Sequence, residues 1–383
     1  MDAVTQAPAW RVALADTTIG AEEIEAVTAV LASRWLSAGP VTAAFEREFA
    51  AALGAPGAVA VSSGTAALHL AMLALPLEGG AEVIVPSLTF VASASAAVLR
   101  GARPVFADVR SESDLTIDPE HVRELVTPRT RAIVVMHYGG FPCDMEALSA
   151  IACDHGIPLI EDAAHAPAVR AGGRMLGTVG DIGCFSFHVA KNVTTGEGGM
   201  VVAADPEVLA QVRMLRSHCV TASSWDRARG TTTGYDVVGA GLNYRPTEIS
   251  SAIGRVQLGR LAADRRCRET LVAAYRAGLA RVPGLVLPFA EHRGDAAHHL
   301  LAVLLPAGAH RAAVQAGLRE AGVQTSVHYP PTHQLSFYAR AHPAGPLPVT
   351  DAVAGRLLSL PLHARMTVED VEHVIGALER ALR

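Results

Sequence analysis

Short apolar segments rich in β-branched residues alternate with helical segments from about residue 58 onwards. The apolar segments read AVAVS, EVIVP, RPVFAD, RAIVVMH and IPLIED, and patterns such as TAALHLAMLAL and DMEALSAIACDH lie between them. A regular alternation of strand and helix is typical of right-handed crossovers that build a mostly parallel sheet with helices on both faces. The pattern therefore predicts an α/β fold for the first part of the chain.

The following part of the chain changes character twice. A helix is predicted over residues 205–217, and the segment 218–243 after it is polar and rich in Gly, Thr and Ser. So long a loop inside a compact domain is usually functional or reaches a partner surface. A long helical pattern then runs from Thr247 to about Arg281, and we expect this helix to link two domains.

The C-terminal part predicts a second, smaller unit. The segments LLAVLLP, HRAAVQAGLREAG, VQTSVHY and TVEDVEHVIGALERAL read as strand, helix, strand and helix, which suffices for a small α+β domain. We therefore divide the chain into a large α/β domain over residues 1–250, which includes an N-terminal segment 1–55, and a small domain over 251–383 that includes the linking helix.

Composition narrows the class of partner and the compartment. The 383 residues carry a formal net charge of -5, and arginines and glutamates are scattered, so no basic surface for nucleic acid is indicated. The five cysteines form no CxxC pair, which favours reduced thiols. The N-terminus lacks the pattern of a signal peptide, and the longest apolar run is too short to span a bilayer. We expect a soluble cytoplasmic protein without a nucleic-acid or membrane partner.

Several common catalytic motifs are missing from the sequence. There is no HExxH, no GxxxxGK[ST] and no GxSxG, and the glycines of GTVGDIG do not have the spacing of a dinucleotide-binding loop. Sixteen histidines suggest metal binding, but only His298 and His299 are close together. Adjacent residues point apart in a strand, so we expect no metal site.

Two segments provide an anion site and a carboxylate. SSGTAAL, residues 62–68, follows a strand and opens a helix, so the backbone N–H groups near Gly64 and Thr65 and the Thr65 hydroxyl would face an anion; an ordinary helix cap is the alternative. IPLIEDAAHA places Glu161 and Asp162 where a parallel strand ends, so a carboxylate there can pair with a cationic atom of a ligand. Its alternative is again a helix cap.

The third segment, FSFHVAKNVTTGEGGM, contains Lys191 between apolar and glycine-rich residues. Burial of a lysine lowers its pKa and increases the share of neutral amine that can attack a carbonyl, whereas a surface lysine is the alternative. An anion site, an acid at a strand end and a sequestered lysine together meet the requirements of pyridoxal phosphate.

These motifs resemble those of the DegT/DnrJ/EryC1/StrS family of sugar aminotransferases, which have the fold type I architecture of pyridoxal-phosphate-dependent transferases. The resemblance runs from WLSAGPVTAAFEREFAAALG to SLPLHARMTVEDV, nearly the whole chain, and includes SSGTAALHL, EVIVPSLTFVAS, IEDAAHA, GDIGCFSFHVAKNVTTGEGGM, GLNYRPTEISSAIGRVQL and SVHYPP. Six ordered motifs make a chance agreement improbable.

The resemblance implies a role for each matching residue. Lys191 matches the lysine that holds the cofactor as a covalent aldimine, and Asp162 matches the partner of the pyridinium nitrogen. His165 lies at the position beside the phenolic oxygen, and Phe90 matches the aromatic residue that stacks on the cofactor ring. The positions that match the phosphate-binding segments are Gly64, Thr65, Ala66 and Ser186.

Other residues receive weaker assignments from the same resemblance. Asn243 matches a residue that reaches the phosphate from a neighbouring subunit, which implies a homodimer with shared active sites. His188, His328 and Tyr329 are candidates for substrate contacts, although the last two could equally pack a domain interface. Arg245 is a candidate for the carboxylate of the amino donor, with a structural ion pair as the alternative.

The resemblance also implies a reaction. Some family members carry His in place of the lysine and act as sugar dehydratases, so Lys191 favours transamination. The implied activity moves an amino group from glutamate or glutamine to a keto group of a nucleotide-linked deoxysugar, for natural-product or surface-glycan biosynthesis. An aminocyclitol aminotransferase, a dehydratase or aminohydroxybenzoate-synthase-like lyase, and a cofactor-binding protein without catalysis remain alternatives.

Overall fold

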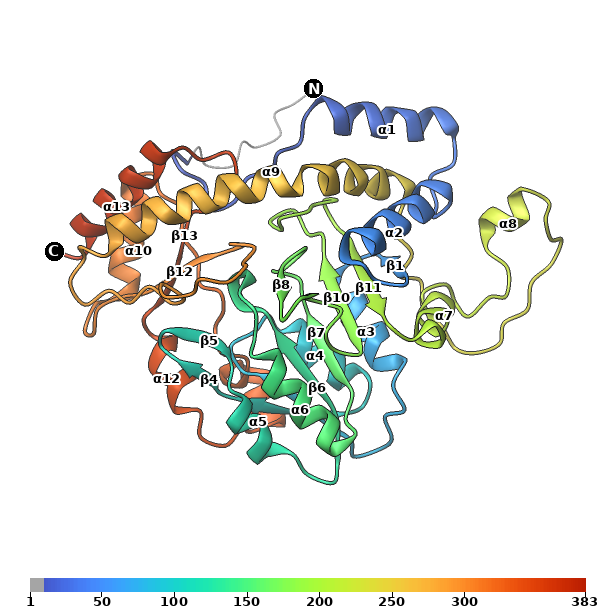
Figure 1. Cartoon of the computed structure of the whole chain (residues 1–383), viewed down its shortest axis with the longest axis horizontal. Coiled ribbons are helices and arrows are strands. Elements are labelled where there is room, and N and C mark those ends of the chain that lie inside the picture. Colours follow the sequence, from blue (N-terminus) through green and yellow to red (C-terminus); the bar gives the residue numbers. More distant parts are fainter. Residues whose placement is uncertain (1–9) are drawn as a thin grey trace.

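The computed structural model describes residues 10–383, and a seven-stranded sheet forms the centre of this part of the chain (Figure 1). The strand order is β1–β11–β10–β7–β6–β2–β3. All neighbouring strands from β10 to β3 are parallel, whereas β11 is antiparallel to both of its neighbours. The predicted α/β fold with a mostly parallel sheet is confirmed. The strands are β1 (Ala58–Val61), β2 (Glu82–Pro86), β3 (Arg103–Ala107), β6 (Thr130–Met136), β7 (Leu159–Asp162), β10 (Ile182–Ser186) and β11 (Gly199–Ala203).

Helices cover both faces of this sheet because its strands are apolar on both sides. Along β2, Val83 and Val85 pack into one core, whereas Ile84 between them packs into another. This alternation is the period of two that a strand imposes on its side chains. The first core contains α3 (Gly64–Leu73), α4 (Ala92–Leu99) and α7 (Pro206–Leu215), and the second contains α5 (Pro119–Leu125) and α6 (Met145–His155).

One long helix, α9 (Glu248–Leu279), runs across the molecule and confirms the helix expected from Thr247 onwards (Figure 1). Thr247 is its N-cap, and the Thr247 hydroxyl accepts a hydrogen bond from the Ser250 N–H at 3.0 Å. The helix contacts α1 (Ala21–Ser33) and α2 (Pro40–Leu53) near one end and α13 (Val368–Ala381) near the other. Within residues 10–383, neither this helix nor another has the length and apolar character to cross a membrane.

The C-terminal part contains an apolar core of its own, beside an antiparallel pair of strands. Tyr275 of α9 lies in this core with side chains from β12 (Leu301–Leu304), β13 (Leu357–Leu360), α10 (Arg311–Glu320) and α13. The short helix α11 (Ser336–Ala341) packs against the large sheet. The helix α12 (Pro348–Ala354) contacts a separate hairpin of the strands β4 (Val109–Ser111) and β5 (Asp114–Ile117). The division at residue 250 stays a prediction.

The strand expected in VQTSVHY is wrong. Residues 323–329 form only single bridges, from Val323 to Val12 and from Ser326 to Ser359, so their backbone groups are divided between two neighbours. The described fold also contains the hairpin strands β4 (Val109–Ser111) and β5 (Asp114–Ile117), the hairpin strands β8 (Arg170–Ala171) and β9 (Arg174–Met175), and single turns of 3-10 helix at Tyr138–Gly140 and Thr332–Gln334.

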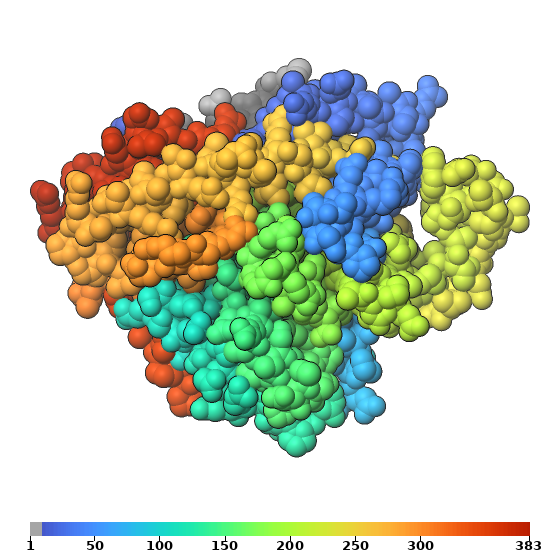
Figure 2. Space-filling view, viewed as in Figure 1, coloured from blue at the N-terminus to red at the C-terminus, as the bar shows by residue number. Residues whose placement is uncertain are grey.

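The polar segment 218–243 forms a lobe that projects from the body of the protein (Figures 1 and 2). It contains one short helix, α8 (Ser224–Ala228), whose Trp225 ring lies 5.0 Å from the ring of Trp35. Three apolar side chains on the lobe are more than half exposed, namely Tyr235, Val237 and Val238. Grouped exposed apolar residues of this kind are typical of surfaces that contact a partner.

A buried glutamate joins the start of α9 to the start of α2. The Glu248 side chain is 2% exposed, and its carboxylate accepts hydrogen bonds from the N–H groups of Gly39, Val41 and Thr42 and from the Thr42 hydroxyl, at 2.7 to 2.9 Å. These N–H groups belong to the first turn of α2, which would otherwise lack partners.

We expect Glu248→Ala to lower the free energy of unfolding by about 3 kcal/mol, because it leaves several buried donors without an acceptor. Urea unfolding measures this change. Glu48→Ala is the matched control: Glu48 also joins α2 to α9, through an exposed ion pair with Arg255 at 2.7 Å, and such pairs contribute at most about 1 kcal/mol. Equal losses in the two variants would contradict the assignment.

Candidate active site

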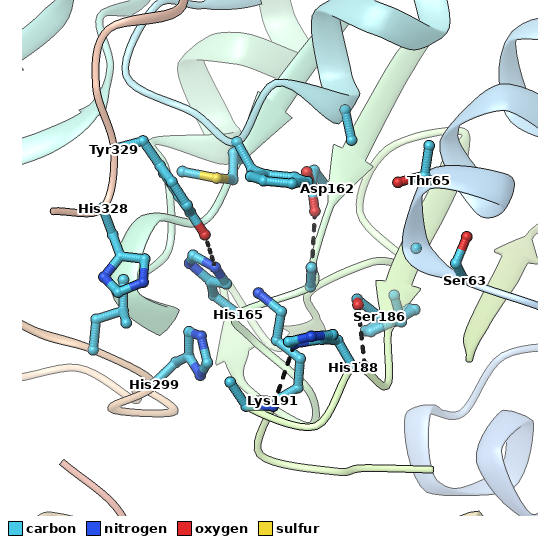
Figure 3. A pocket seen from close by; sticks show the side chains of 18 of the residues that line it. Ser63, Thr65, Asp162, His165, Ser186, His188, Lys191, His299, His328 and Tyr329 are labelled. Carbon is cyan, nitrogen blue, oxygen red and sulfur yellow. Dashed lines mark hydrogen bonds between the residues drawn. The ribbon is translucent and has the colours of Figure 1, made fainter. Parts of the chain in front are cut away.

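A pocket of about 390 Å³ opens where the parallel strands of the large sheet end (Figure 3). Its lining includes residues at or just beyond the carboxyl ends of strands: Ser63 after β1, Phe90 after β2, Met136 of β6, Asp162 of β7 and Ser186 of β10. Ligands of open α/β sheets bind at this edge, and the volume lies in the usual range for small-molecule sites. The fold therefore gathers the predicted residues into one cavity.

One end of the pocket is the N-terminus of α3. Ser63 is the N-cap, and its hydroxyl accepts a hydrogen bond from the Ala66 N–H at 3.1 Å. The N–H groups of Gly64 and Thr65 make no hydrogen bond within residues 10–383, and both residues line the pocket. A helix N-terminus with free N–H groups attracts anions. The segment thus has both a cap and an anion-facing end.

Gly64 also allows a close approach between α3 and β10. A Cβ atom at this position would lie 2.7 Å from the Cβ of Ser186, so a larger residue would push the helix away from the strand. Ser186 lines the same end of the pocket, whereas Ala66 does not line the pocket and its N–H is taken by Ser63. The phosphate-binding roles of these residues remain predictions.

Of the two adjacent carboxylates, only Asp162 faces the pocket. Its oxygens accept hydrogen bonds from the Ser93 hydroxyl at 3.2 Å and the Ala164 N–H at 3.1 Å, and burial raises its pKa. Glu161 points to the other side, where it binds His137 at 2.9 Å and three backbone N–H groups. No helix begins after Asp162, so the alternative of a helix cap is wrong.

Lys191 lines the pocket between Asp162 and the histidines, and it is the only lysine in the sequence. Every other one of the 32 Lys and Arg residues is an arginine. Burial lowers the pKa of the Lys191 ammonium to about 8, although the charge of Asp162 acts in the opposite direction. The neutral, nucleophilic amine is therefore available near physiological pH.

The end of the pocket opposite α3 is a wall of imidazole and phenol groups (Figure 3). The His165 Nε2 atom lies 2.9 Å from the Tyr329 hydroxyl, and the rings of His165 and His299 are 4.2 Å apart. Burial lowers the pKa of His328 to about 4 and places the pKa values of His165 and His299 well below the usual range. All three imidazoles are thus neutral near pH 7.

The sequence analysis missed Ser63 and His299, which line this pocket, and Ser93, which supports Asp162 from outside the lining. Ser63 was recognised only as part of the SSGTAAL segment, although a serine before a helical pattern is a standard signal for an N-cap. His299 was considered only as a metal ligand. Ser93, which holds Asp162, lies inside a helix and carries no local signal.

The remaining predicted residues have more exposed positions. His188 lines the pocket and is half exposed, 4.0 Å from Glu197, and the Phe90 ring is 51% exposed and lies 5.6 Å from the ring of Tyr329. Asn243 and Arg245 do not line the pocket of their own chain. A role for Asn243 in a neighbouring subunit and a donor-binding role for Arg245 stay predictions.

Across residues 10–383, no cluster of three or more His, Cys, Asp or Glu side chains has the arrangement of a metal site. His298 and His299 lie side by side in the sequence, yet only His299 lines the large pocket, whereas His298 lines a small cavity beside Phe141. His298 has a left-handed backbone with a φ of 47°, so the two side chains diverge at a change of chain direction and not by the alternation of a strand.

Residues 17–379 match the family model of the DegT/DnrJ/EryC1/StrS aminotransferases, and the chain belongs to this family of enzymes. It is 40% identical over 367 residues to the spore coat polysaccharide biosynthesis protein SpsC of Bacillus subtilis, covering 94% of each chain. The aminotransferase TlmJ of Streptoalloteichus hindustanus is 38% identical with a TM-score of 0.90, covering 97% of this chain and 98% of TlmJ. The resemblance seen in the motifs is confirmed.

Two further solved structures carry ligand information. DesI, described in the presence of its TDP-sugar product, is 33% identical with a TM-score of 0.87, covering 99% of this chain and 94% of DesI. A sugar aminotransferase of Streptococcus pneumoniae, described in its PLP form, is 27% identical with a TM-score of 0.88, covering 96% of this chain and 97% of that one.

The geometry of the pocket fits pyridoxal phosphate. The free N–H groups of Gly64 and Thr65 can donate hydrogen bonds to the phosphate, and Asp162 can pair with the ring nitrogen across the cavity. Burial raises the pKa of Asp162, and a cation beside this carboxylate would favour its ionised form again. The amine of Lys191 completes the three requirements.

We expect Lys191 of the cofactor-free protein to react with a small acylating reagent at a rate that rises through about pH 8. Its lowered pKa leaves the amine protonated and unreactive below that pH and neutral above it. Peptide mass spectrometry measures the labelling and separates it from that of the α-amine. Free Nα-acetyl-lysine in the same tube, with a midpoint near 10.4, is the control. Identical midpoints for the two amines would contradict the lowered pKa.

Proposed function

We propose that this aminotransferase uses pyridoxal phosphate to move an amino group from glutamate or glutamine to a keto group of a nucleotide-linked deoxysugar, which becomes an amino sugar. The observation that carries the proposal is the position of the only lysine, in the same pocket as Asp162 and the open N-terminus of α3. The names of two relatives support a sugar substrate, since SpsC is a polysaccharide biosynthesis protein and DesI was solved with a TDP-sugar.

Lys191 has two tasks in this proposal. Pyridoxal phosphate supplies an aldehyde carbon that bonds to amines and a ring that accepts the electrons of a neighbouring carbanion. The neutral Lys191 amine would hold the cofactor until an amino acid binds. The freed amine would then take a proton from the donor Cα and deliver it again, a task for which a pKa of about 8 is well suited.

Asp162 and His165 hold the two polar edges of the cofactor ring. The ionised Asp162, fixed by Ser93 and the Ala164 N–H, keeps the ring nitrogen protonated. His165 donates a hydrogen bond from Nε2 towards the phenolic oxygen, and Phe90 covers the face of the ring. Ser63, Thr65 and Ser186 surround the phosphate.

The substrates need cations that this pocket lacks. Among its lining residues in 10–383, Lys191 is the only one with a basic side chain other than histidine, and the buried imidazoles are neutral. A donor carboxylate and a nucleotide diphosphate would therefore be bound by a second copy of the chain. The projecting lobe 218–243 carries Arg227, Arg229 and Asn243, and we propose that it enters the partner's site in a homodimer.

The proposal places the enzyme in the cytoplasm, where amino-acid donors and nucleotide sugars are available, and in the synthesis of a surface glycan or a natural product. The donor carboxylate, the keto group of the acceptor and the hydroxyl groups of its ring would all lie within reach of Lys191 and the histidine wall. His188, His328 and Tyr329 are the side chains that we assign to the acceptor.

Reduction of the holoenzyme with borohydride tests the cofactor assignment. We expect one cofactor per chain, attached to the peptide that contains Lys191, and no visible absorbance and no turnover in Lys191→Ala. Cofactor trapped elsewhere, or full turnover in Lys191→Ala, would contradict the proposal.

Incubation with glutamate should convert the bound cofactor and release one 2-oxoglutarate per chain, whereas a lyase or a non-catalytic binding protein would release none.

We expect Asp162→Asn to bind the cofactor but to react with glutamate at least about 100-fold more slowly, because a neutral amide cannot hold the ring nitrogen protonated. Single-turnover absorbance changes measure the rate. Asp205→Asn, at the N-cap of α7 and outside the pocket, is the control and should keep the wild-type rate. A normal rate in Asp162→Asn would contradict the role of the carboxylate.

A further inference from the structure

A buried cluster of polar groups lies behind Lys191 and joins segments from four parts of the chain. Its centre is the contact between the rings of His165 and His299, whose centroids are 4.2 Å apart with planes inclined by 38° (Figure 3). His165 follows β7, whereas His299 comes from the segment before β12. Both residues are almost fully buried, at 1% and 6% exposure.

Asn192, the residue after Lys191, fixes the orientation of His299. Its Nδ2 group donates to the carbonyl oxygen of Ala297 at 2.8 Å, and this bond assigns the two ends of the amide. The Oδ1 atom therefore faces His299 Nδ1, at 2.9 Å, and must accept a hydrogen bond from it. His299 is thus a neutral imidazole with its proton on Nδ1, held in place by the neighbour of Lys191.

The turn at Gly139 and Gly140 fixes both histidines. The Gly139 N–H donates to His165 Nδ1 at 3.3 Å, so the proton of the neutral His165 ring lies on Nε2. The carbonyl oxygen of Gly139 accepts a hydrogen bond from the backbone N–H of His299 at 2.8 Å. A Cβ atom at Gly140 would lie 2.7 Å from the carbonyl oxygen of His165, so the close packing of this turn requires glycine.

Arg268 of α9 anchors the same segment from the other side. Its buried guanidinium donates to the carbonyl oxygens of His298 at 3.2 Å, His299 at 3.4 Å and Leu362 at 2.9 Å. Burial lowers the pKa of His299, and the nearby His165, Lys191 and Arg268 act in the same direction.

We propose that His299 is a positioning residue: its ring, held by Asn192, backs the ring of His165 and keeps the His165 Nε2–H directed into the pocket, towards the phenolic oxygen of the cofactor. This inference rests on the proposed binding of pyridoxal phosphate. In this structure the His165 Nε2 atom faces the Tyr329 hydroxyl, so contacts within the protein direct this N–H group.

The absorbance of the bound cofactor reports this hydrogen bond. A donor at the phenolic oxygen stabilises the deprotonated chromophore, so a weaker donor raises the pH midpoint of the visible absorbance change. His299→Asn keeps a donor near the Nδ1 position but removes the ring, and we expect its midpoint to rise by about one pH unit, tenfold in the dissociation constant. His299→Phe restores a ring without the bond to Asn192, and we expect a smaller rise.

His298→Phe is the matched control, because it changes the adjacent buried histidine that lies outside the large pocket. It should leave the midpoint unchanged even where its melting temperature falls as much as that of His299→Asn. An unchanged midpoint in His299→Asn, or an equal rise in His298→Phe, would overturn the inference. If His299→Asn does not fold, His299→Phe against His298→Phe decides, since only the former should shift.

A failure of the positioning role of His299 can be told apart from a failure of the proposed function. A wild-type protein that shows no visible absorbance with pyridoxal phosphate would contradict the cofactor assignment itself. A wild-type protein with a clear midpoint, and His299 variants with the same midpoint, would contradict only the positioning role.

Discussion

The parallel pairing of β7 with β10 is the constraint on which the site depends. Asp162 lies opposite Cys184 in this pair, and Ser186 ends β10 two residues later, so the carboxylate and the hydroxyl lie at the same edge of the sheet. The chain that leaves β10 there reaches Lys191 within five residues and then returns as the antiparallel strand β11. The register of the β7–β10 pair therefore sets the spacing between Asp162, Ser186 and Lys191.

Burial at that edge moves the pKa values of the enclosed groups in opposite directions. It lowers the pKa of Lys191 to about 8 and the pKa values of the imidazoles below their usual range, whereas it raises the pKa of Asp162. The protein stabilises this arrangement with fixed hydrogen bonds from Ser93, Asn192 and the Gly139 turn. A ligand with both an anionic and a cationic end complements such a pocket.

Local signals in the sequence predicted most of this arrangement. The strand end at Asp162, the helix start in SSGTAAL and the long helix after Thr247 all follow from patterns within a few residues. The roles of His299 and Ser93 could not be predicted in this way, because they depend on contacts between segments more than 60 positions apart. The strand expected in VQTSVHY was wrong for the same reason, since its pairing partners lie at the two ends of the chain.

The absence of any second lysine has a consequence for regulation. Metabolic acyl donors modify ε-amines on protein surfaces, where the added group usually changes little. In this chain the same chemistry has one side-chain target, and that target is the amine to which the proposed function assigns the reaction. Under that proposal, a cofactor attached to Lys191 would also protect the protein, because an occupied site would leave no side-chain amine to be modified.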